Sequence, residues 1–147
     1  MPHHFFLGAD HAGFQMKEAL KARLLAAGER VDDLGCHSEE RVDYPDYAAA
    51  VGRAVAAEAG SFGLLVCGSG IGISIAANKI PGVRAALAHD ETTARLSREH
   101  NDANILCLGA RTTGAETAAA ALAVFMATPF AGGRHAGRVE KISRLEK

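Results

Sequence analysis

The chain has 147 residues, enough for one ordinary domain with a sizeable core and too few for two. Hydrophobic residues make up 48% of it and charged residues 22%, a composition typical of a soluble globular protein. The formal net charge of -1 argues against nucleic acids or membrane surfaces as partners that bind through bulk charge, although it leaves room for a small basic patch.

The use of cysteine predicts a reducing compartment. Cys36, Cys67 and Cys107 are odd in number and widely spaced, so the sequence contains no disulfide framework and no CxxC metal pair. The first residues lack the charged region, apolar core and cleavage site of a signal peptide, and the apolar runs are far short of a membrane span. We therefore expect a cytoplasmic protein.

Apolar runs alternate with amphipathic segments along the whole chain, as in an α/β protein. Gly28 and Pro45 mark the end of one predicted helix and the start of the next. In chain order we predict a strand at 4–9, a helix at 13–27, a strand at 30–34, a helix at 45–59, a strand at 62–67, a helix at 70–78, a strand at 83–88, a helix at 91–99, a strand at 104–108, and helices at 114–126 and 136–145. This order predicts a single three-layer α/β/α domain, Rossmann-like, with a five-stranded parallel sheet.

Chemically capable side chains follow several of the predicted strands. Ligands bind at the carboxyl ends of the strands in parallel α/β sheets. The residues expected there are Asp10 and His11 after the first strand, Cys67, Gly68 and Ser69 after the third, His89 and Asp90 after the fourth, and Gly109, Ala110 and Arg111 after the fifth.

The glycine-rich stretch after the third strand favours anion binding. Gly68, Gly70 and Gly72 allow a tight turn with exposed N–H groups, and the positive end of the following helix adds to them. The spacing does not fit the dinucleotide pattern GxGxxG, and no Lys-Ser/Thr pair follows as in a Walker loop. A plain tight turn is the alternative.

Cys67 lies at the start of this loop. A thiolate at a helix N-terminus is stabilised, so Cys67 is a candidate base or nucleophile. The alternative is a small buried hydrophobe, which is the usual place of a free cysteine and the one we expect for Cys36 and Cys107.

Two histidines and an asparagine lie near the ends of predicted elements. His100 and Asn101 follow the helix at 91–99, and histidine is the natural acid/base group near neutral pH. Favourable placement on the helix dipole explains His100 equally well. His89 has a similar context, and no physical argument ranks it below His100. Asp10 could contact a ligand or cap the next helix.

Arg134 and Arg138 lie four residues apart, and therefore on one face if their segment is helical. Two guanidinium groups placed in this way can bind a phosphate dianion. The alternative is a solvated basic face.

Six segments resemble, in order, those of one enzyme family. They are GADHAGF at 8–14, DYPDYA at 43–48, CGSGIGISIAANK at 67–79, RLSREHNDANIL at 95–106, GAR at 109–111 and GGRHAGRV at 132–139. Together they resemble the type B ribose-5-phosphate isomerases and their relatives that act on galactose or allose 6-phosphate.

The resemblance implies an aldose–ketose isomerase that interconverts ribose 5-phosphate and ribulose 5-phosphate through an enediolate. Cys67 matches the base of the family. One branch lacks the cysteine and uses a glutamate a few residues further on. The position that matches this glutamate is Ile73 here, so the chain resembles the cysteine branch. The resemblance implies that Ser69 orients a proton and that His100 opens the furanose ring. The loop N–H groups would stabilise the enediolate oxygens; they belong to Gly68, Gly70, Ile71 and Gly72.

The remaining roles are also implied by the resemblance. Asp10 and Asn101 would contact sugar hydroxyls and the ring oxygen. The phosphate would be held by His11, Arg111, Arg134 and Arg138. The family forms homodimers, sometimes paired into tetramers, with the cysteine loop from one chain and the His100-Asn101 segment from the other in each active site. It needs no metal and no organic cofactor.

Two alternatives remain open at this point. The first is the same chemistry on a six-carbon phosphosugar. The relatives that act on galactose 6-phosphate divide the site residues between two unlike subunits, whereas this chain carries Cys67, His100 and the arginines together. The second is a non-catalytic phosphosugar-binding module, which would need the loop but not the thiol.

Overall fold

A parallel sheet lies at the centre of the computed structural model, which describes residues 2–146. The strand order is β2-β1-β3-β5-β4. The strands are β1 (His4–Ala9), β2 (Arg30–Asp33), β3 (Phe62–Cys67), β4 (Ala85–Leu87) and β5 (Ile105–Gly109). The helices are α1 (Phe14–Ala26), α2 (Tyr44–Ala57), α3 (Ile71–Ala77), α4 (Glu91–Asn101), α5 (Ala115–Ala127) and α6 (Arg134–Ser143). The predicted three-layer α/β/α fold is thus confirmed.

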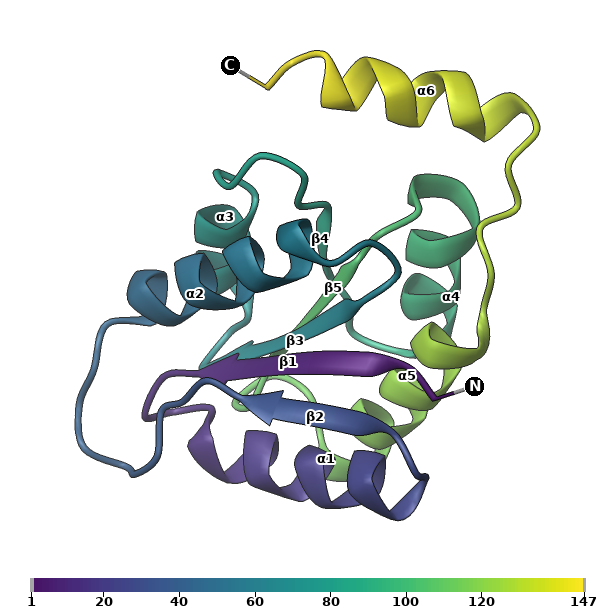
Figure 1. Ribbon diagram of the computed structural model, residues 1–147. Coiled ribbons are helices and arrows are strands. Elements are labelled where there is room, and N and C mark those ends of the chain that lie inside the picture. Colours follow the sequence, from purple (N-terminus) through teal and green to yellow (C-terminus); the bar gives the residue numbers. More distant parts are fainter. Residues whose placement is uncertain (1, 147) are drawn as a thin grey trace.

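Helices cover both faces of the sheet (Figure 1), and alternate strand residues enter two separate cores. Leu64 and Val66 of β3 belong to the core under α1, α4 and α5. Leu65 and Cys67 belong to the core under α2 and α3. Burial on both faces explains why the central strands read as continuous apolar runs. No helix within residues 2–146 has both the length and the apolar character needed to cross a membrane.

Several predicted boundaries differ from the structure by one or two residues. The fourth strand covers only Ala85–Leu87, because it lies at the sheet edge and pairs with β5 alone. Val83 is apolar because it packs into the core under α2 and α3, outside the strand. Helix α4 continues to Asn101, so His100 and Asn101 form its last turn instead of following it. Helix α6 begins at Arg134, after two glycines with positive φ.

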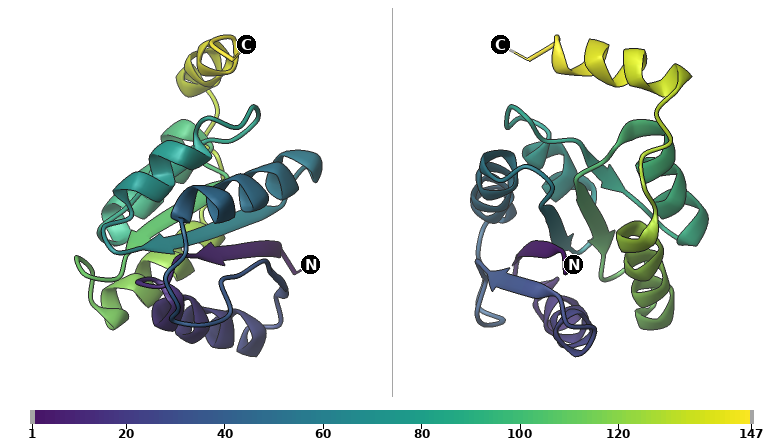
Figure 2. Two further views of the ribbon diagram at one scale, coloured as in Figure 1. Left: turned by 90° about the vertical axis from the view of Figure 1, so that its left-hand side faces the viewer. Right: turned by 45° about the vertical axis from the view of Figure 1, so that its right-hand side comes forward.

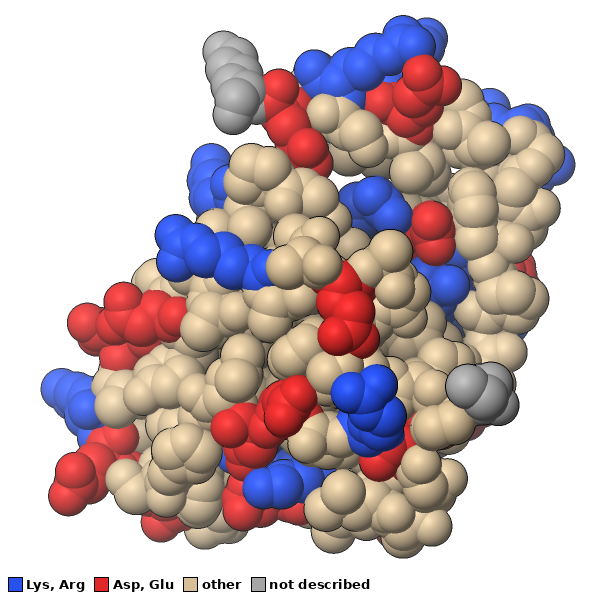
Figure 3. All heavy atoms as spheres, in the orientation of Figure 1, with Lys and Arg blue, Asp and Glu red and all other residues tan. Residues whose placement is uncertain are grey.

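Helix α6 stands out from the rest of the chain (Figures 1 and 2) and packs against α4. Basic side chains gather over it in Figure 3, above a hollow in the surface. This hollow, of about 690 Å³, lies between the end of α6 and the turn that precedes β4. Ile142 and Leu145 line it and are 42% and 78% exposed. The single chain therefore leaves apolar side chains of its C-terminal segment uncovered.

A buried ion pair fixes the turn after β2. The Lys17 ammonium is fully buried and lies 2.6 Å from Asp33 Oδ2, which also contacts Lys21 Nζ at 3.1 Å. Asp33 Oδ1 accepts the N–H of Gly35 at 3.0 Å. The Gly35 carbonyl in turn accepts the N–H of Ala9 at 2.8 Å. The ion pair therefore holds this turn against the end of β1.

Lys17→Met should lower the free energy of unfolding by about 3 kcal/mol, because it leaves a buried carboxylate with one exposed partner. Burial alone would raise the pKa of Asp33, but hydrogen bonds from Lys17, the Gly35 N–H and Lys21 outweigh it and lower that pKa. The stability that Asp33 contributes is thus present above the pKa of an unfolded aspartate and is lost as the pH falls through the lowered value.

Urea unfolding at neutral and acid pH measures both effects. Lys21→Met is the matched control, since its side chain is 34% exposed, and we expect it to lose less than about 1 kcal/mol. Equal losses in the two variants would contradict the assignment of Lys17 as the main partner of Asp33.

Candidate active site

The candidate active site lies at a topological switch point of the sheet. β1 leads into α1 and its neighbour β3 leads into α3, and these helices cover opposite faces. Ala9 and Val66 are paired in the two strands, and the Asp10 N–H donates to the Val66 carbonyl at 3.2 Å. A crevice at the carboxyl ends of such a strand pair is where open α/β sheets bind ligands.

The glycine loop wraps around the Cys67 thiol. Cys67 ends β3 with 4% of its surface exposed, and its Sγ accepts the Gly70 N–H at 3.1 Å. Gly70 has φ +75°, and a Cβ there would lie 2.9 Å from the Leu108 carbonyl carbon. Ser69 Oγ accepts the Ile71 N–H at 3.1 Å. The loop conformation therefore requires glycine at position 70 and directs a backbone donor at the sulfur.

Backbone hydrogen bonds bring Arg111 to this loop. The carbonyls of Cys67 and Gly68 accept the N–H groups of Ala110 at 2.9 Å and Arg111 at 2.8 Å. A Cβ on Gly68 would lie 3.2 Å from Arg111 Nη1, so the guanidinium reaches the loop backbone. The structure thus brings together a thiol, a glycine loop and a cation, as the strand-end argument predicts.

Asp10 and His11 follow β1, next to the end of β3. Asp10 is buried, and its Oδ1 accepts the Gly13 N–H at 3.0 Å. The N-cap residue of α1 is Gly13, so Asp10 holds the turn before the helix and does not cap it. His11 Nδ1 accepts the Val42 N–H at 3.2 Å, which leaves Nε2 as the ring N–H donor. His11 and Arg111 line one pocket of about 550 Å³.

His100 and Asn101 lie at the opposite end of the strands, where the strands begin. Helix α4 runs back from the carboxyl end of β4, so its last turn lies near the start of β5. Arg134 and Arg138 are exposed on α6, which packs against α4. Within one chain, these four residues therefore lie about the length of a strand away from the Cys67 loop.

His135, which sequence reasoning missed, lies between α4 and α6 at this end of the strands. Its ring stacks on that of His100, with centroids 4.3 Å apart and an interplanar angle of 18°. Burial lowers the pKa of His135, and so do the charges of His100, Arg134 and Arg138. Its position between two arginines in GGRHAGRV was the signal that could have marked it.

Tyr44 is a second residue that sequence reasoning missed. A Cβ on Gly72 would lie 2.5 Å from Cζ and 2.6 Å from Oη of Tyr44, so the ring lies directly against the loop. The segment DYPDYA contains Tyr44, but its position in sequence does not indicate this contact. Gly72 is thus needed for close approach of a side chain from α2.

The His89 backbone N–H donates to Thr93 Oγ1 at 3.0 Å, next to the Asp90 cap of α4, and its side chain is exposed. No group of three or more His, Cys, Asp or Glu side chains within residues 2–146 is arranged to hold a metal ion.

The fold and this arrangement define a three-layer α/β protein with a glycine-rich loop and a thiol at its switch point. The chain belongs to the ribose/galactose isomerase family, whose model matches residues 5–142.

Relatives and solved structures agree with this assignment. The chain is 45% identical over 140 residues to "Ribose-5-phosphate isomerase B" of Escherichia coli (strain K12), covering 95% of this chain and 94% of the relative. The structure of type B ribose 5-phosphate isomerase from Trypanosoma brucei has a TM-score of 0.94 and 50% identity, covering 99% of this chain and 100% of that one. That of Clostridium thermocellum ribose-5-phosphate isomerase B has a TM-score of 0.95 and 45% identity, covering 97% and 96%.

Gly70→Ala should destabilise the protein by about 2 kcal/mol or more, because alanine disfavours the left-handed region and would overlap the β5 backbone. Gly72→Ala is the matched variant in the same loop. We expect it to cost less, because the ring of Tyr44 is exposed and can rotate away. Thermal unfolding of both variants measures the order, and a larger loss in Gly72→Ala would contradict it.

Proposed function

We propose that this protein interconverts D-ribose 5-phosphate and D-ribulose 5-phosphate through an enediolate, with Cys67 as the base. The observation that carries the proposal is the Cys67 thiol, held by the Gly70 N–H at the switch point of the sheet. Membership of the ribose/galactose isomerase family supports it, as do the relatives named ribose-5-phosphate isomerase B.

The proton transfer uses the thiol and the loop together. The Cys67 thiolate takes the proton from C2 of the open-chain aldose and returns it to C1. The loop N–H groups between Gly68 and Gly72 that do not already donate to Cys67 Sγ or Ser69 Oγ stabilise the enediolate oxygens, a contribution of about 3–4 kcal/mol for each preorganised donor. Ser69 orients the proton that moves between the oxygens. Burial raises the pKa of Cys107, as does the adjacent Cys67, so the Cys107 thiol stays protonated.

The remaining residues bind and open the sugar. His100 transfers the protons of ring opening, and Asp10 and Asn101 bind sugar hydroxyls and the ring oxygen. The phosphate is bound by cationic side chains and one imidazole, namely Arg111, Arg134, Arg138 and His11.

This assignment requires two copies of the chain. Five to six residues of strand span about 17–20 Å, more than the length of a pentose phosphate, so one chain cannot bring Cys67 and His100 to one substrate. We propose a homodimer in which the α4 end and α6 of one copy complete the Cys67 site of the other. Exposed apolar residues on both sides support such an interface, with Ile71 and Ile75 beside the loop and Ile142 and Leu145 near α6.

The first experiment compares turnover of ribose 5-phosphate and allose 6-phosphate. Cys67→Ala should lose about a hundredfold to ten-thousandfold in turnover of the pentose while it still binds the phosphosugar. Cys107→Ala is the matched control, because that thiol is fully buried in the next strand and has no assigned role. Faster turnover of the hexose would keep the mechanism and change the sugar. Binding without turnover in the parent protein would favour the phosphosugar-binding module.

The shared site is tested by mixing two inactive variants. Cys67→Ala and His100→Asn should each be nearly inactive alone. After subunit exchange, half of the dimers are mixed and each has one intact site, so activity should return to about a quarter of the parent level. Absence of recovery, with subunit exchange shown by differently tagged chains, would contradict a site shared between copies.

A further inference from the structure

Helix α4 ends in a left-handed backbone conformation, which is uncommon for residues other than glycine. Asp102, directly after His100 and Asn101, has φ 47° and ψ 43°. Within residues 2–146 it is the only non-glycine residue with a positive φ. Such a conformation persists only where the surrounding structure holds it. The two residues before Asp102 are those proposed to open and bind the sugar ring.

Two arginines bind this turn from different elements. Arg98 Nη1 donates to Asp102 Oδ1 at 2.9 Å and to the Ala103 carbonyl at 2.6 Å. Arg84 Nε donates to the carbonyls of Asn101 and Asp102, each at 3.0 Å, and its Nη2 lies 3.3 Å from Asp102 Oδ2. The Asp102 carboxylate thus bridges the two guanidinium groups, and Arg84 also binds the backbone of Asn101.

The two arginines differ in their surroundings. Arg98 is 8% exposed, and its guanidinium lies 4.9 Å from the Phe62 ring centroid and 5.7 Å from that of Phe125. Arg98 is therefore part of the folded core. The Arg84 side chain is 21% exposed, and its backbone pairs with Asn104 through two hydrogen bonds of 2.8 and 2.9 Å. Arg84 directly precedes β4, and these two hydrogen bonds hold its backbone in place while its side chain reaches the end of α4.

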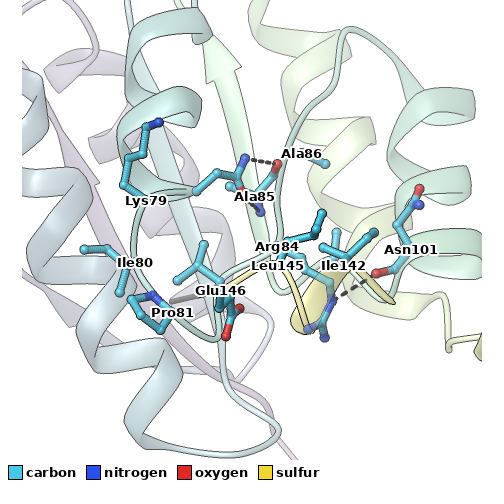
Figure 4. A pocket seen from close by; sticks show the side chains of 13 residues that line it. Lys79, Ile80, Pro81, Arg84, Ala85, Ala86, Asn101, Ile142, Leu145 and Glu146 are labelled. Carbon is cyan, nitrogen blue, oxygen red and sulfur yellow. Dashed lines mark hydrogen bonds between the residues drawn. The ribbon is translucent and has the colours of Figure 1, made fainter. Parts of the chain in front are cut away.

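Figure 4 shows how Arg84 and Asn101 lie relative to each other. The Arg84 guanidinium meets the Asn101 backbone carbonyl, and the Asn101 side-chain amide points away from it. The last carbonyls of a helix carry its negative end, which favours a cation there. The planar fork of arginine binds several acceptors at once, which the single ammonium of lysine cannot do in the same geometry.

We propose that Arg84 is a positioning residue for sugar-ring opening. It holds the last turn of α4, and thereby the His100 imidazole and the Asn101 amide, in the orientation that the closed sugar requires. The inference rests on the proposed function, in which His100 opens the ring.

Turnover of the aldose compared with turnover of the ketose distinguishes a positioning role of Arg84 from a general loss of structure. In ring opening the C1 hydroxyl loses its proton, the bond between C1 and O4 breaks, and O4 gains a proton. Ribulose 5-phosphate has no closed furanose form, because its O5 carries the phosphate. Ring-opening groups therefore act on bound closed aldose, whereas ribulose 5-phosphate enters the site already open and its product can leave as the open-chain aldose, which closes in solution.

The test measures kcat at saturating substrate in both directions for Arg84→Met and Arg84→Lys, because the equilibrium constant fixes the ratio of the two kcat/KM values in every variant. Arg84→Met should lower the aldose-to-ketose kcat about tenfold or more, since closed furanose then fills the site without opening, and keep the ketose-to-aldose kcat within about twofold. At high enzyme concentration its aldose-direction rate should level off, because spontaneous ring opening in solution then limits the supply of open-chain aldose. Arg84→Lys, which keeps the charge and loses the fork, should lie between this variant and the parent protein.

Arg95→Met is the matched control. Arg95 lies on the outer face of α4, is 45% exposed and pairs with Glu99 one turn on. It should leave both directions unchanged.

Three results would overturn the positioning role: an equal fall in both directions, no fall in either, or an equal asymmetry in Arg95→Met. If Arg84→Met fails to fold, the same comparison with Arg84→Lys decides. A parent protein without turnover would instead overturn the proposed function.

Discussion

Parallel pairing of β1 with β3 determines where this protein can bind a ligand. The two strands lead to helices on opposite faces, and open α/β sheets bind ligands at the carboxyl ends of such a strand pair. Asp10 and the Cys67 loop lie there because they directly follow the paired residues Ala9 and Val66. Contacts that hold the strand ends, such as the Lys17–Asp33 pair and the turn at Gly35, therefore also hold the site.

The direction of α4 sets the second constraint. A crossover helix between parallel strands must return to the amino ends of the strands. This places His100 far from the thiol of its own chain. His100 and the α6 arginines consequently lie apart from the Cys67 loop, with His135 stacked on His100. Division of the site between two copies follows from this geometry together with the proposed chemistry. The uncovered apolar residues Ile142, on α6, and Leu145, just after it, agree with such an arrangement.

Sequence reasoning was most successful where the pattern is local. The continuous apolar runs of β3 and β5 predicted buried parallel strands, and all eleven elements predicted occur within residues 2–146. It was wrong about the length of β4, because Val83 is apolar for packing and not for strand pairing. It also placed His100 after α4, because the sequence alone does not show that Asp102 ends the helix with two arginine partners. The cytoplasmic location stays a prediction.

The sequence by itself determined the order of the elements and the residues at the strand ends, because apolar periodicity and glycine spacing are local properties of the chain. It also contained the motifs of the isomerase family. Only the tertiary structure decided which of these residues meet. The contacts of Tyr44 with Gly72, His135 with His100 and Arg84 with Asn101 join residues from different elements. Such contacts depend on how helices pack on the sheet, which no local pattern specifies.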